Sequence, residues 1–486
     1  MKLSQLLDGT GVACPPELDG EIAGITCDSR RVEPGWAFVC IQGTAQDGHA
    51  YAEKAAQAGA AVVVAQRDVG LPCQLLAAST RRTWALMCAN WFGRPAEKLH
   101  MVGVTGTNGK TTTTCMLKSV LEACGHKVGL IGTIQNMIGT RVLPAGHTTP
   151  DPYDLQSMLA LMAAEGCAYC VMEVSSHALD QDRVEGCTFD AAVFTNLTQD
   201  HLDYHKTMEN YLAAKKRLFS LCRHAIINAD DPWADKLTEG LPCPVDTYSA
   251  KSDAADYTAR EIHQRPEGVE FQLVGTGVIG RVRLRIPGLF SVYNALAAAA
   301  CALRLGLPFD KVVEALSAVQ GVKGRAEIVP TGRDFTVVID YAHTPDGLEN
   351  ICKTMKACTK GRLITVFGCG GDRDKGKRPL MGATAAKYAD FLVVTSDNPR
   401  TEEPGAIIRD ILAGLPEGGA PYEVVENRIE AIRFALANAR EGDIVLLAGK
   451  GHETYQILAD GVIHLDEREV VAEALNCLLY TSDAAD

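Results

Sequence analysis

Short apolar runs alternate with segments whose apolar residues recur at helical spacing along most of the chain. Between residues 98 and 324, buried strands are predicted at 99–104, 169–174, 191–195 and 225–228, and helices at 111–123, 154–164 and 209–221. After residue 325, strands are predicted at 336–340, 363–367, 391–395 and 443–448, with helices between them and a last helix at 470–479. This alternation is typical of mostly parallel sheets covered by helices on both faces.

The remaining patterns divide the chain further. Strands at 37–41 and 60–65 and a helix at 51–58 predict a small α/β unit before residue 98, and two runs of period two within 269–286 predict an antiparallel pair. A chain of 486 residues is too long for one hydrophobic core. We therefore expect an α/β protein of three domains. These are a small N-terminal domain (1–97), a central P-loop ATPase-like domain with a mostly parallel sheet (98–324) and a Rossmann-like, doubly wound domain (325–486).

Composition and charge exclude several classes of protein. A net charge of -13 argues against non-specific nucleic-acid binding, which needs a basic surface. No apolar run reaches the ~18 residues of a membrane helix, and the first residues lack a signal-peptide core. Seventeen cysteines without a disulfide rhythm suit a reducing cytoplasm. Cys167 and Cys170 form a C-x-x-C, but no second pair completes a zinc site, so we interpret both as core residues.

A glycine-rich stretch at 103–114 joins the predicted strand at 99–104 to the helix at 111–123. Gly106 and Gly109 allow the backbone N–H groups to converge on an anion, Lys110 can reach terminal phosphates, and the Thr111 hydroxyl can ligate Mg²⁺. Val104 departs from the strict P-loop pattern, which has glycine there. An ordinary glycine turn is the alternative, but Lys-Thr and both flanking elements favour binding of a nucleoside triphosphate.

Polar residues follow several other predicted strands of the central region. Glu173 closes one strand and is suited to Mg²⁺, although a cap or ion pair is a common role for such a residue. His201 follows the next strand, where it could share the same crevice or serve as a hydrogen-bonded structural histidine. Lys215 lies in the basic run 213–217 on a predicted helix, which alone indicates a solvated face.

In the third region, glycine-rich polar loops at 367–378, 396–401 and 448–453 follow three strands. Because the carboxyl ends of parallel strands meet at one sheet edge, the loops predict an anion-recognising pocket there. Lys375, Lys377 and Arg378 are individually interpreted as surface charge. No motif extends into the polar tail at 480–486.

Together these motifs resemble the ATP-dependent Mur ligases of peptidoglycan synthesis. The likeness is carried, in order, by residues 105–111 (TGTNGKT), 173–177 (EVSSH), 200–205 (DHLDYH), 340–345 (DYAHTP), 368–374 (GCGGDRD), 397–400 (DNPR) and 449–453 (GKGHE). It covers nearly the whole chain, and is strongest to the members that add meso-2,6-diaminopimelate to UDP-N-acetylmuramoyl-L-alanyl-D-glutamate.

The resemblance implies a set of site residues. ATP is implied at Gly106, Thr107, Asn108, Gly109, Lys110, Thr111, Thr112, Asn294, Arg325 and Asp340. Magnesium is implied at Thr111, Glu173, His201 and Lys215, with Lys215 carbamylated by CO₂ and therefore anionic, and catalysis at Lys110, Glu173, His201 and Lys215. The UDP-muramoyl dipeptide is implied at Cys27, Ser29, Thr44, Ala45, Gln46, Thr148, Thr149, Ser175, Gln181 and Arg183. Diaminopimelate is implied at Arg373, Asp397, Asn398, Pro399, Arg400, Gly449 and Glu453.

The implied reaction is amide ligation by a cytoplasmic, monomeric enzyme. ATP phosphorylates the D-glutamate γ-carboxylate, and the amine of diaminopimelate attacks the resulting acyl phosphate. Arg400 selects diaminopimelate over lysine, because a guanidinium pairs with the second carboxylate that lysine lacks. His343 is a candidate general base, with a structural role as the alternative, and we expect the third domain to close over the second.

Two other functions remain open from the sequence. A folylpolyglutamate-type ligase shares the phosphate cradle and the amide chemistry, but gives no account of the loop at 397–400 or of the long first domain. A regulatory protein that hydrolyses ATP slowly, without joining substrates, is a second alternative. An assay of phosphate release separates the three functions. Only the Mur-type ligase should require both the UDP-muramoyl dipeptide and an amino acid.

Overall fold

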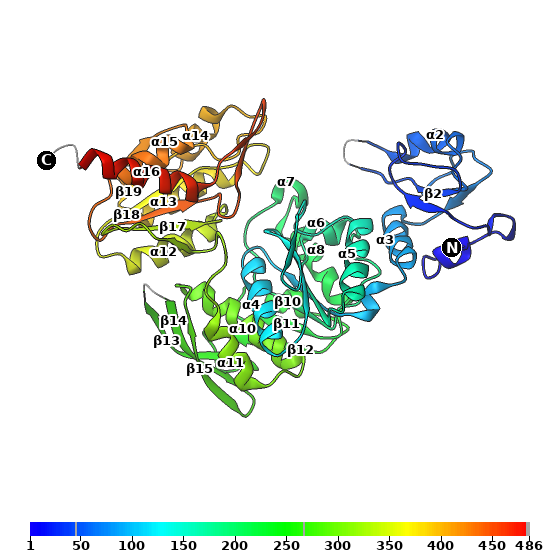
Figure 1. The fold of residues 1–486 in the computed structure, drawn as a ribbon, viewed down its shortest axis with the longest axis horizontal. Helices are drawn as coiled ribbons and strands as arrows, with labels where there is room; N and C mark the ends of the chain where they lie inside the picture. Colours follow the sequence, from blue (N-terminus) through cyan, green and yellow to red (C-terminus); the bar gives the residue numbers. More distant parts are fainter. Residues whose placement is uncertain (44–45, 266–267, 483–486) are drawn as a thin grey trace.

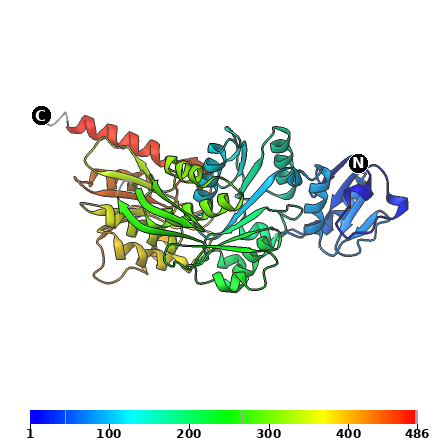
Figure 2. The same cartoon turned by 90° about the horizontal axis from the view of Figure 1, so that it is seen from below.

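The computed structural model describes residues 1–43, 46–265 and 268–482, with the backbone alone for 477–482. Three α/β domains follow one another along the chain, and the first lies at one end of the molecule beside the central domain (Figures 1 and 2). This architecture confirms the predicted fold class. The last four residues of the polar tail, 483–486, lie outside the described residues.

The N-terminal domain is built on a four-stranded parallel sheet of order β1-β2-β3-β4. Its elements are α1 (Leu3–Leu6), β1 (Gly24–Thr26), β2 (Trp36–Val39), α2 (Ala52–Gln57), β3 (Val62–Ala65), β4 (Gln74–Leu76) and α3 (Thr80–Trp91). The apolar runs predicted as strands at 37–41 and 60–65 correspond to β2 and β3, which are almost wholly buried.

The central domain has an 11-stranded sheet of order β15-β14-β13-β12-β11-β10-β5-β9-β6-β7-β8. Its strands are β5 (His100–Thr105), β6 (Val128–Ile131), β7 (Asn136–Ile138), β8 (Arg141–Leu143), β9 (Tyr169–Glu173), β10 (Ala191–Phe194), β11 (Ala225–Asn228), β12 (Val245–Ser249), β13 (Tyr257–Arg265), β14 (Gly268–Gly275) and β15 (Val278–Leu284). Its helices are α4 (Lys110–Ala123), α5 (Pro152–Ala164), α6 (Ser176–Asp180), α7 (Leu202–His205), α8 (Met208–Lys216), α9 (Ala234–Thr238), α10 (Leu289–Arg304) and α11 (Phe309–Ala318). Strands β6, β9, β5, β10, β11 and β12 are parallel, whereas β14 pairs antiparallel with both β13 and β15, as predicted for the period-two runs.

The C-terminal domain has a six-stranded sheet of order β16-β17-β21-β18-β19-β20, in which only the β16–β17 pairing is antiparallel. Its strands are β16 (Glu327–Val329), β17 (Thr336–Asp340), β18 (Leu363–Phe367), β19 (Phe391–Val394), β20 (Tyr422–Val424) and β21 (Ile444–Ala448), followed by the hairpin β22 (Tyr455–Leu458) and β23 (Gly461–His464). Its helices are α12 (Pro345–Cys358), α13 (Lys377–Tyr388), α14 (Pro404–Leu412), α15 (Arg428–Ala437) and α16 (Glu467–Ser482).

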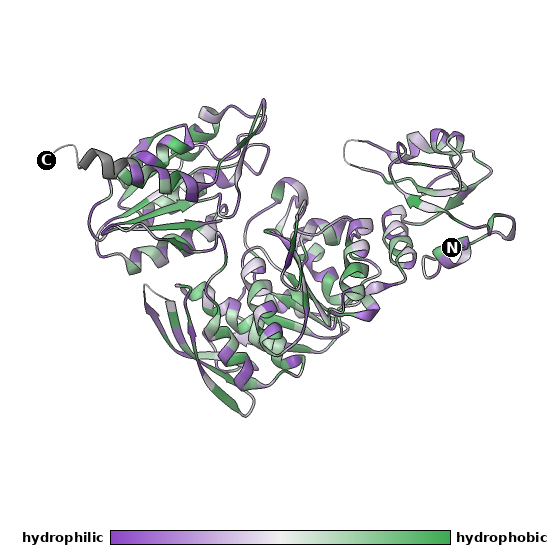
Figure 3. Ribbon diagram, in the orientation of Figure 1, coloured by the Kyte–Doolittle hydropathy of each residue, from purple (hydrophilic) through white to green (hydrophobic). Residues whose placement is uncertain are grey.

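The hydropathy pattern explains which strands the sequence reveals. The four parallel strands β17, β18, β19 and β21 are nearly continuous apolar runs and form the hydrophobic interior of the third domain (Figure 3). Strand β13 escaped prediction because most of its second half is polar and solvent-exposed. The helix predicted at 209–221 ends as an α-helix at Lys216 and continues as a 3₁₀ turn, a common way for helices to end. Cys167 and Cys170 are buried, which confirms that they are core residues.

No helix in the described part of the chain combines the length and apolar character needed to cross a membrane.

Candidate active site

The phosphate cradle lies between β5 and the N-terminus of α4, and two glycines are required to build it. Gly106 has φ +153°, and a Cβ there would meet Thr195 Oγ1 at 1.8 Å. Gly109 has φ +87°, and its Cβ would meet Asn294 Oδ1 at 2.4 Å. Only glycine combines these backbone angles with so close an approach of neighbouring side chains. The loop therefore turns sharply before α4 begins at Lys110.

Residues after β10 hold the cradle in place. Asn196 accepts a hydrogen bond from the Asn108 backbone N–H at 2.8 Å and donates to the Asn108 carbonyl at 3.1 Å. Thr195 Oγ1 donates to the same carbonyl at 2.6 Å. The loop conformation is thus fixed by the neighbouring strand, as preorganised anion binding requires.

The cations of the cradle are Lys110 and Arg325. Lys110 Nζ donates to the carbonyls of Gly106 and Thr107, both at 2.8 Å, and burial lowers the pKa of Lys110. Arg325, the first residue of the predicted C-terminal domain, donates to Thr111 Oγ1 at 3.1 Å. Its Nε is buried without a hydrogen-bond partner among the described residues. An unpartnered guanidinium N–H beside the cradle is suited to an anionic ligand.

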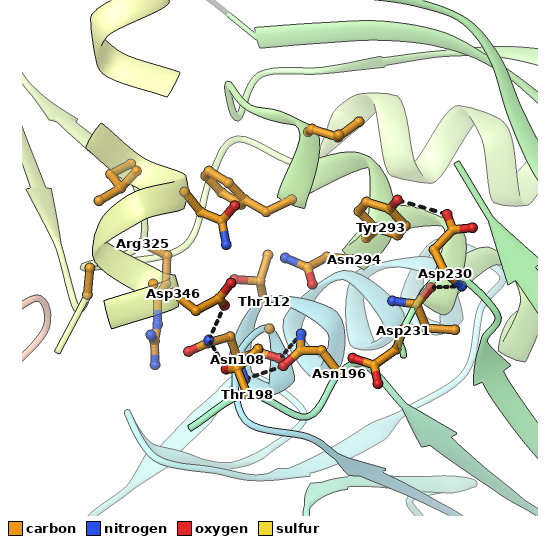
Figure 4. A pocket seen from close by; sticks show the side chains of 18 of the residues that line it. Asn108, Thr112, Asn196, Thr198, Asp230, Asp231, Tyr293, Asn294, Arg325 and Asp346 are labelled. Atoms are coloured by element: carbon orange, nitrogen blue, oxygen red, sulfur yellow. Dashed lines mark hydrogen bonds between the residues drawn. The ribbon is translucent and has the colours of Figure 1, made fainter. Parts of the chain in front are cut away.

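A cavity of about 430 Å³ opens next to the cradle, between the central and C-terminal domains (Figure 4). Its lining includes Asn108, Gly109, Thr112, Asn294, Arg325 and Asp340 from the predicted ATP site, together with Phe290, Tyr293, Asp346, Asn350 and Ile351. Apolar side chains at one end and amide and carboxylate groups near the loop suit a nucleoside. The cavity therefore brings together residues separated by more than two hundred positions in sequence.

Gly109→Ala tests whether the close approach of Asn294 matters. Gly125 is a matched control, because it has φ +89° but its Cβ would meet nothing within 4 Å. Both substitutions carry the strain of a left-handed alanine, about 1–2 kcal/mol. We expect Gly109→Ala alone to displace Asn294 and raise the KM for ATP by about tenfold or more, which is at least 1.4 kcal/mol. Steady-state kinetics and thermal unfolding separate the two effects, and equal KM values for both variants would contradict this assignment.

The predicted magnesium ligands come from two helices, the end of a strand and a loop: Thr111 lies in α4, Lys215 in α8, Glu173 at the end of β9 and His201 just before α7. Glu173 is fully buried at the end of β9, where it accepts hydrogen bonds from the N–H (2.8 Å) and hydroxyl (3.0 Å) of Thr133. Glu173 and Thr111 line the same small cavity of about 180 Å³. Carboxylate and hydroxyl oxygens are donors that Mg²⁺ prefers, so this part of the set fits the ion. Among the described residues no group of three or more His, Cys, Asp and Glu could hold a metal by itself.

His201 and Lys215 complete the predicted set. His201 precedes α7 with φ +54°, its ring lies 4.9 Å from that of His177, and burial lowers its pKa. The interpretation of Lys215 as part of a solvated face is wrong, because its side chain is 1% exposed and its Nζ donates to the Gly106 carbonyl at 2.8 Å. Burial, and then repulsion by Lys110, lowers the pKa of Lys215 well below its usual value. CO₂ reacts with the neutral form of an amine, and the lowered pKa of Lys215 favours that form.

The residues predicted to bind the muramoyl dipeptide gather beside Glu173. Thr149 Oγ1 donates to the Glu173 carbonyl (2.9 Å) and accepts from the Ser175 N–H (3.0 Å), and Arg183 donates to the Thr149 carbonyl (3.1 Å). Thr148 contacts Thr133, and Gln181 accepts from Arg183. In the first domain, Cys27 and Gln46 are exposed and Ser29 is half-buried, while Thr44 and Ala45 lie outside the described residues. The predictions for these UDP contacts stay untested.

The predicted amino-acid pocket lies at the carboxyl ends of β18, β19 and β21, which are neighbours in the sheet. Asn398 donates to Glu453 at 2.9 Å, and a Cβ at Gly449 would lie 2.7 Å from Asp397. Arg400 has φ +55°, and its Nη1 donates to the carbonyls of Gly371 (2.8 Å) and Asn398 (3.3 Å). Pro399 is buried and Arg373 is exposed, with its Cγ 3.8 Å from where a Gly370 Cβ would lie. The structure therefore brings the three predicted loops together.

Two of the cations interpreted as surface charge are buried, so that interpretation is wrong for Lys377 and Arg378. Arg378 is 1% exposed and pairs with Glu402 and Asp410, both at 2.8 Å. Lys377 is 6% exposed and lies 3.5 Å from Asp200 of the central domain. Only Lys375 stays exposed. The sequence alone could not predict this burial, because the carboxylates that pair with Lys377 and Arg378 are not their neighbours in the chain.

Asp200 is where the C-terminal domain contacts the part of the site that carries the predicted magnesium ligands. Besides Lys377 it contacts His201 at 3.4 Å and His343 at 3.8 Å. Burial alone would raise the pKa of Asp200, but Lys377 and the two imidazoles hold it below its usual range. His343 also bonds through Nδ1 to the Tyr341 carbonyl, which orients its ring. These contacts join the loop that carries Arg373 to the residue next to His201.

Comparison with known proteins agrees with this arrangement. Family models match the Mur ligase middle domain at residues 104–302, the Mur ligase glutamate ligase domain at 324–451 and the Mur ligase family catalytic domain at 21–81. A UDP-N-acetylmuramoyl-L-alanyl-D-glutamate–2,6-diaminopimelate ligase of Caldanaerobacter subterraneus is 50% identical over 480 residues, covering 98% of this chain and 99% of that protein. The chain belongs to the Mur ligase family. A ligase of the same name from Syntrophomonas wolfei is 48% identical over 485 residues, with 98% and 99% coverage.

Solved structures place this Mur ligase in the same fold. A UDP-N-acetylmuramoyl-L-alanyl-D-glutamate–2,6-diaminopimelate ligase structure is 33% identical, with a TM-score of 0.71 over 98% of this chain and 99% of that one. A folylpolyglutamate synthase from Mycobacterium tuberculosis, complexed with ADP, shares the fold at 20% identity and a TM-score of 0.62 over 76% and 91% of the two chains.

Sequence reasoning missed several residues that shape the site of this Mur ligase. Asp346 accepts a hydrogen bond from Asn108 at 2.8 Å across the domain boundary. Thr133 binds both oxygens of Glu173, and Asn196 fixes the cradle. Asn196 directly follows the strand predicted at 191–195, and Asp346 directly follows the motif at 340–345, which was an available signal. Thr133 follows β6 in an unremarkable stretch and could not be found without the fold.

Lys377→Met tests the contact between the domains. It leaves the buried Asp200 carboxylate without its cation, and an uncompensated buried charge costs about 3–5 kcal/mol. We expect weaker docking of the C-terminal domain and a fall in kcat of about tenfold or more, with a larger radius of gyration in X-ray scattering with nucleotide bound. Lys375→Met, on the same loop but 67% exposed at its side chain, is the matched control. A compact, fully active Lys377→Met protein would contradict a role in docking.

Proposed function

We propose that this Mur ligase joins meso-2,6-diaminopimelate to UDP-N-acetylmuramoyl-L-alanyl-D-glutamate, with ATP as the phosphoryl donor. The observation that carries the proposal is the placement of Arg400, Asn398 and Glu453 at one sheet edge of the domain that meets the phosphate cradle. The names of the relatives that match nearly the whole chain support the same substrates. We also propose that the protein acts as a monomer.

The amino-acid pocket has the polarity that diaminopimelate needs. Arg400 supplies hydrogen-bond donors to the pocket. In the described part of the chain, protein carbonyls accept hydrogen bonds from its Nη1 only. Its Nε and Nη2 are therefore available to a carboxylate of the substrate. Glu453, 11% exposed at its side chain, presents acceptors to an ammonium group. Lysine has no second carboxylate and would leave the Arg400 guanidinium unpaired, a mismatch that sites built on hydrogen bonds reject strongly.

The cradle supplies the electrostatics of phosphoryl transfer. Lys110 bonds to the Gly106 carbonyl and Arg325 to the Thr111 hydroxyl, so both cations lie at the cradle, where the terminal phosphates of ATP would be held, and would offset negative charge that develops there. Thr111, Glu173, His201 and carbamylated Lys215 would hold magnesium, which would supply positive charge to offset the charge of the transferred phosphoryl group. Carbamylation requires the neutral amine of Lys215, and its burial favours that form.

The proposed reaction has two steps. An oxygen of the D-glutamate γ-carboxylate attacks the γ-phosphorus of ATP, and ADP leaves, which gives an acyl phosphate. The amine of diaminopimelate then attacks the acyl carbon, and the tetrahedral intermediate releases phosphate and a proton to form the amide. Thr149, Ser175 and Arg183 lie beside Glu173 and would orient the muramoyl peptide for the first step.

Phosphate release measured with substrates omitted one at a time tests the proposal. We expect turnover only when ATP, the UDP-muramoyl dipeptide and diaminopimelate are all present, and much less with lysine. Equal rates with both amino acids would contradict the substrate assignment. Turnover without an amino acid would favour a regulatory ATPase, and turnover with a folate acceptor and glutamate would favour a folylpolyglutamate-type ligase.

A further inference from the structure

A fully buried lysine lies directly beneath the proposed amino-acid pocket. Lys450 follows β21 and is 0% exposed. Its Nζ donates to Asn398 Oδ1 at 2.9 Å and to Glu453 Oε2 at 2.6 Å. Lys450 thus contacts two of the predicted pocket residues at once, although it is too deep to face the pocket itself.

These bonds dictate what the pocket offers to a substrate. Asn398 Oδ1 also accepts from the Ile457 N–H, and Asn398 Nδ2 donates to Glu453 Oε2, so protein groups take both lone pairs of Oδ1 and one of the two Nδ2 hydrogens. Glu453 Oε2 therefore receives two donors. Glu453 Oε1 has one hydrogen bond, from Tyr341 Oη at 3.3 Å, and keeps acceptor capacity. Lys450 thereby fixes the Glu453 carboxylate so that Oε2 points toward Lys450 and Oε1 can still accept a hydrogen bond from a substrate.

The charges below the pocket are closely balanced. Arg428 and Glu467 form a pair at 2.8 Å with both side chains 0% exposed, and Arg428 Nη1 lies 4.0 Å from Asp397. With Lys450 and Glu453, the network holds the carboxylates of Asp397, Glu453 and Glu467 against the cations Lys450 and Arg428. Within this buried network, which does not include the half-buried Arg400, the carboxylates outnumber the cations by one, and an ammonium group beside Glu453 would offset that charge.

We propose that Lys450 is a positioning residue of the amino-acid pocket, which acts through Asn398 and Glu453 to aim one Glu453 oxygen at the ammonium group of the incoming amino acid. The inference rests on the proposed function and extends it to a residue behind the pocket. A charge-assisted hydrogen bond to a buried carboxylate both orients it and compensates its desolvation. Without Lys450 the Glu453 side chain loses its inner anchor, and Asn398 loses one of the two donors that hold its amide.

Lys450→Met tests the proposal in the complete enzyme, because methionine keeps most of the unbranched side chain and removes the ammonium. We expect the KM for diaminopimelate to rise about 10- to 100-fold, as for loss of a hydrogen bond to a charged group, while the KM values for ATP and the UDP-muramoyl dipeptide stay within about twofold. The preference for diaminopimelate over lysine should persist, because Arg400 is untouched. Lys356→Met, which removes an exposed lysine paired with Asp390 in the same domain, is the matched control and should behave as wild type.

A double variant keeps the test valid if Lys450→Met folds poorly. Lys450→Met with Glu453→Gln leaves no unpaired carboxylate, and we expect its KM for diaminopimelate to exceed that of Glu453→Gln alone by less than about threefold. An unchanged KM in a folded Lys450→Met protein, an equal rise for all three substrates, or full multiplication of the two single effects would each overturn the proposal. Wild-type enzyme that ignores diaminopimelate would overturn the proposed function, and this inference with it.

Discussion

Lys215→Ala is expected to lower kcat about 1,000-fold or more, and a short carboxylic acid is expected to restore part of the loss. The side chain is buried against the Gly106 carbonyl, 4.4 Å from the centre of the Tyr211 ring, so its removal leaves space beside the cradle. If Lys215 works as an anionic carbamate, the variant loses a magnesium ligand, which is worth several kcal/mol of transition-state stabilisation. Acetate or formate can enter the space and replace the missing oxygens. Phosphate release measured against added acid reports the rescue.

Lys216→Ala is the matched control for this prediction. Lys216 is next in the same helix and donates to the carbonyls of Lys236 and Glu239, away from the cradle. We expect its activity to stay within about twofold of wild type and not to respond to added acid, because surface substitutions change stability by only about 0.5 kcal/mol. An inactive Lys215→Ala protein that is folded but not rescued by any short acid would contradict the carbamate.

Arg400→Lys is expected to collapse the preference for diaminopimelate over lysine. Lysine keeps the charge and the Cβ, so the strain of the left-handed backbone at φ +55° is unchanged, but it lacks the planar fork of donors. We expect kcat/KM for diaminopimelate to fall about 100-fold, or about 2.7 kcal/mol, and that for lysine to change by no more than a few-fold. Competition between the two amino acids in one reaction measures the ratio directly.

Arg409→Lys is the control, because Arg409 lies in the same domain on α14 and is exposed where it pairs with Glu403. It should leave the ratio unchanged. An Arg400→Lys enzyme that still prefers diaminopimelate as strongly as wild type would show that another group recognises the second carboxylate of diaminopimelate.

The sequence predicted the fold class well because parallel strands buried on both faces leave a continuous apolar signal. β9, β18 and β21 are examples, and the polar residues that follow them could be placed at one sheet edge by topology alone. Strands with a polar, exposed face, such as β13, carry no such signal. Gly106 and Gly109 were recognisable because a phosphate loop needs backbone that only glycine can adopt.

The burial of several charged residues could not be predicted from the sequence. Lys215, Lys377, Arg378 and Lys450 look like ordinary solvated cations, yet each is buried against a group distant in the chain or across a tight turn. A buried cation is stable only when a specific acceptor meets it, and that pairing depends on the tertiary structure. The resemblance to Mur ligases supplied Lys215, but only the structure shows that its side chain is enclosed.

The most direct test of the central claim is mass spectrometry of the nucleotide product formed by the full-length protein from ATP, the UDP-muramoyl dipeptide and equal amounts of diaminopimelate and lysine. The structure predicts one dominant product, the dipeptide substrate extended by a single diaminopimelate residue, with phosphate released in equal amount. A product extended by lysine, or phosphate release with no extended product, would contradict it.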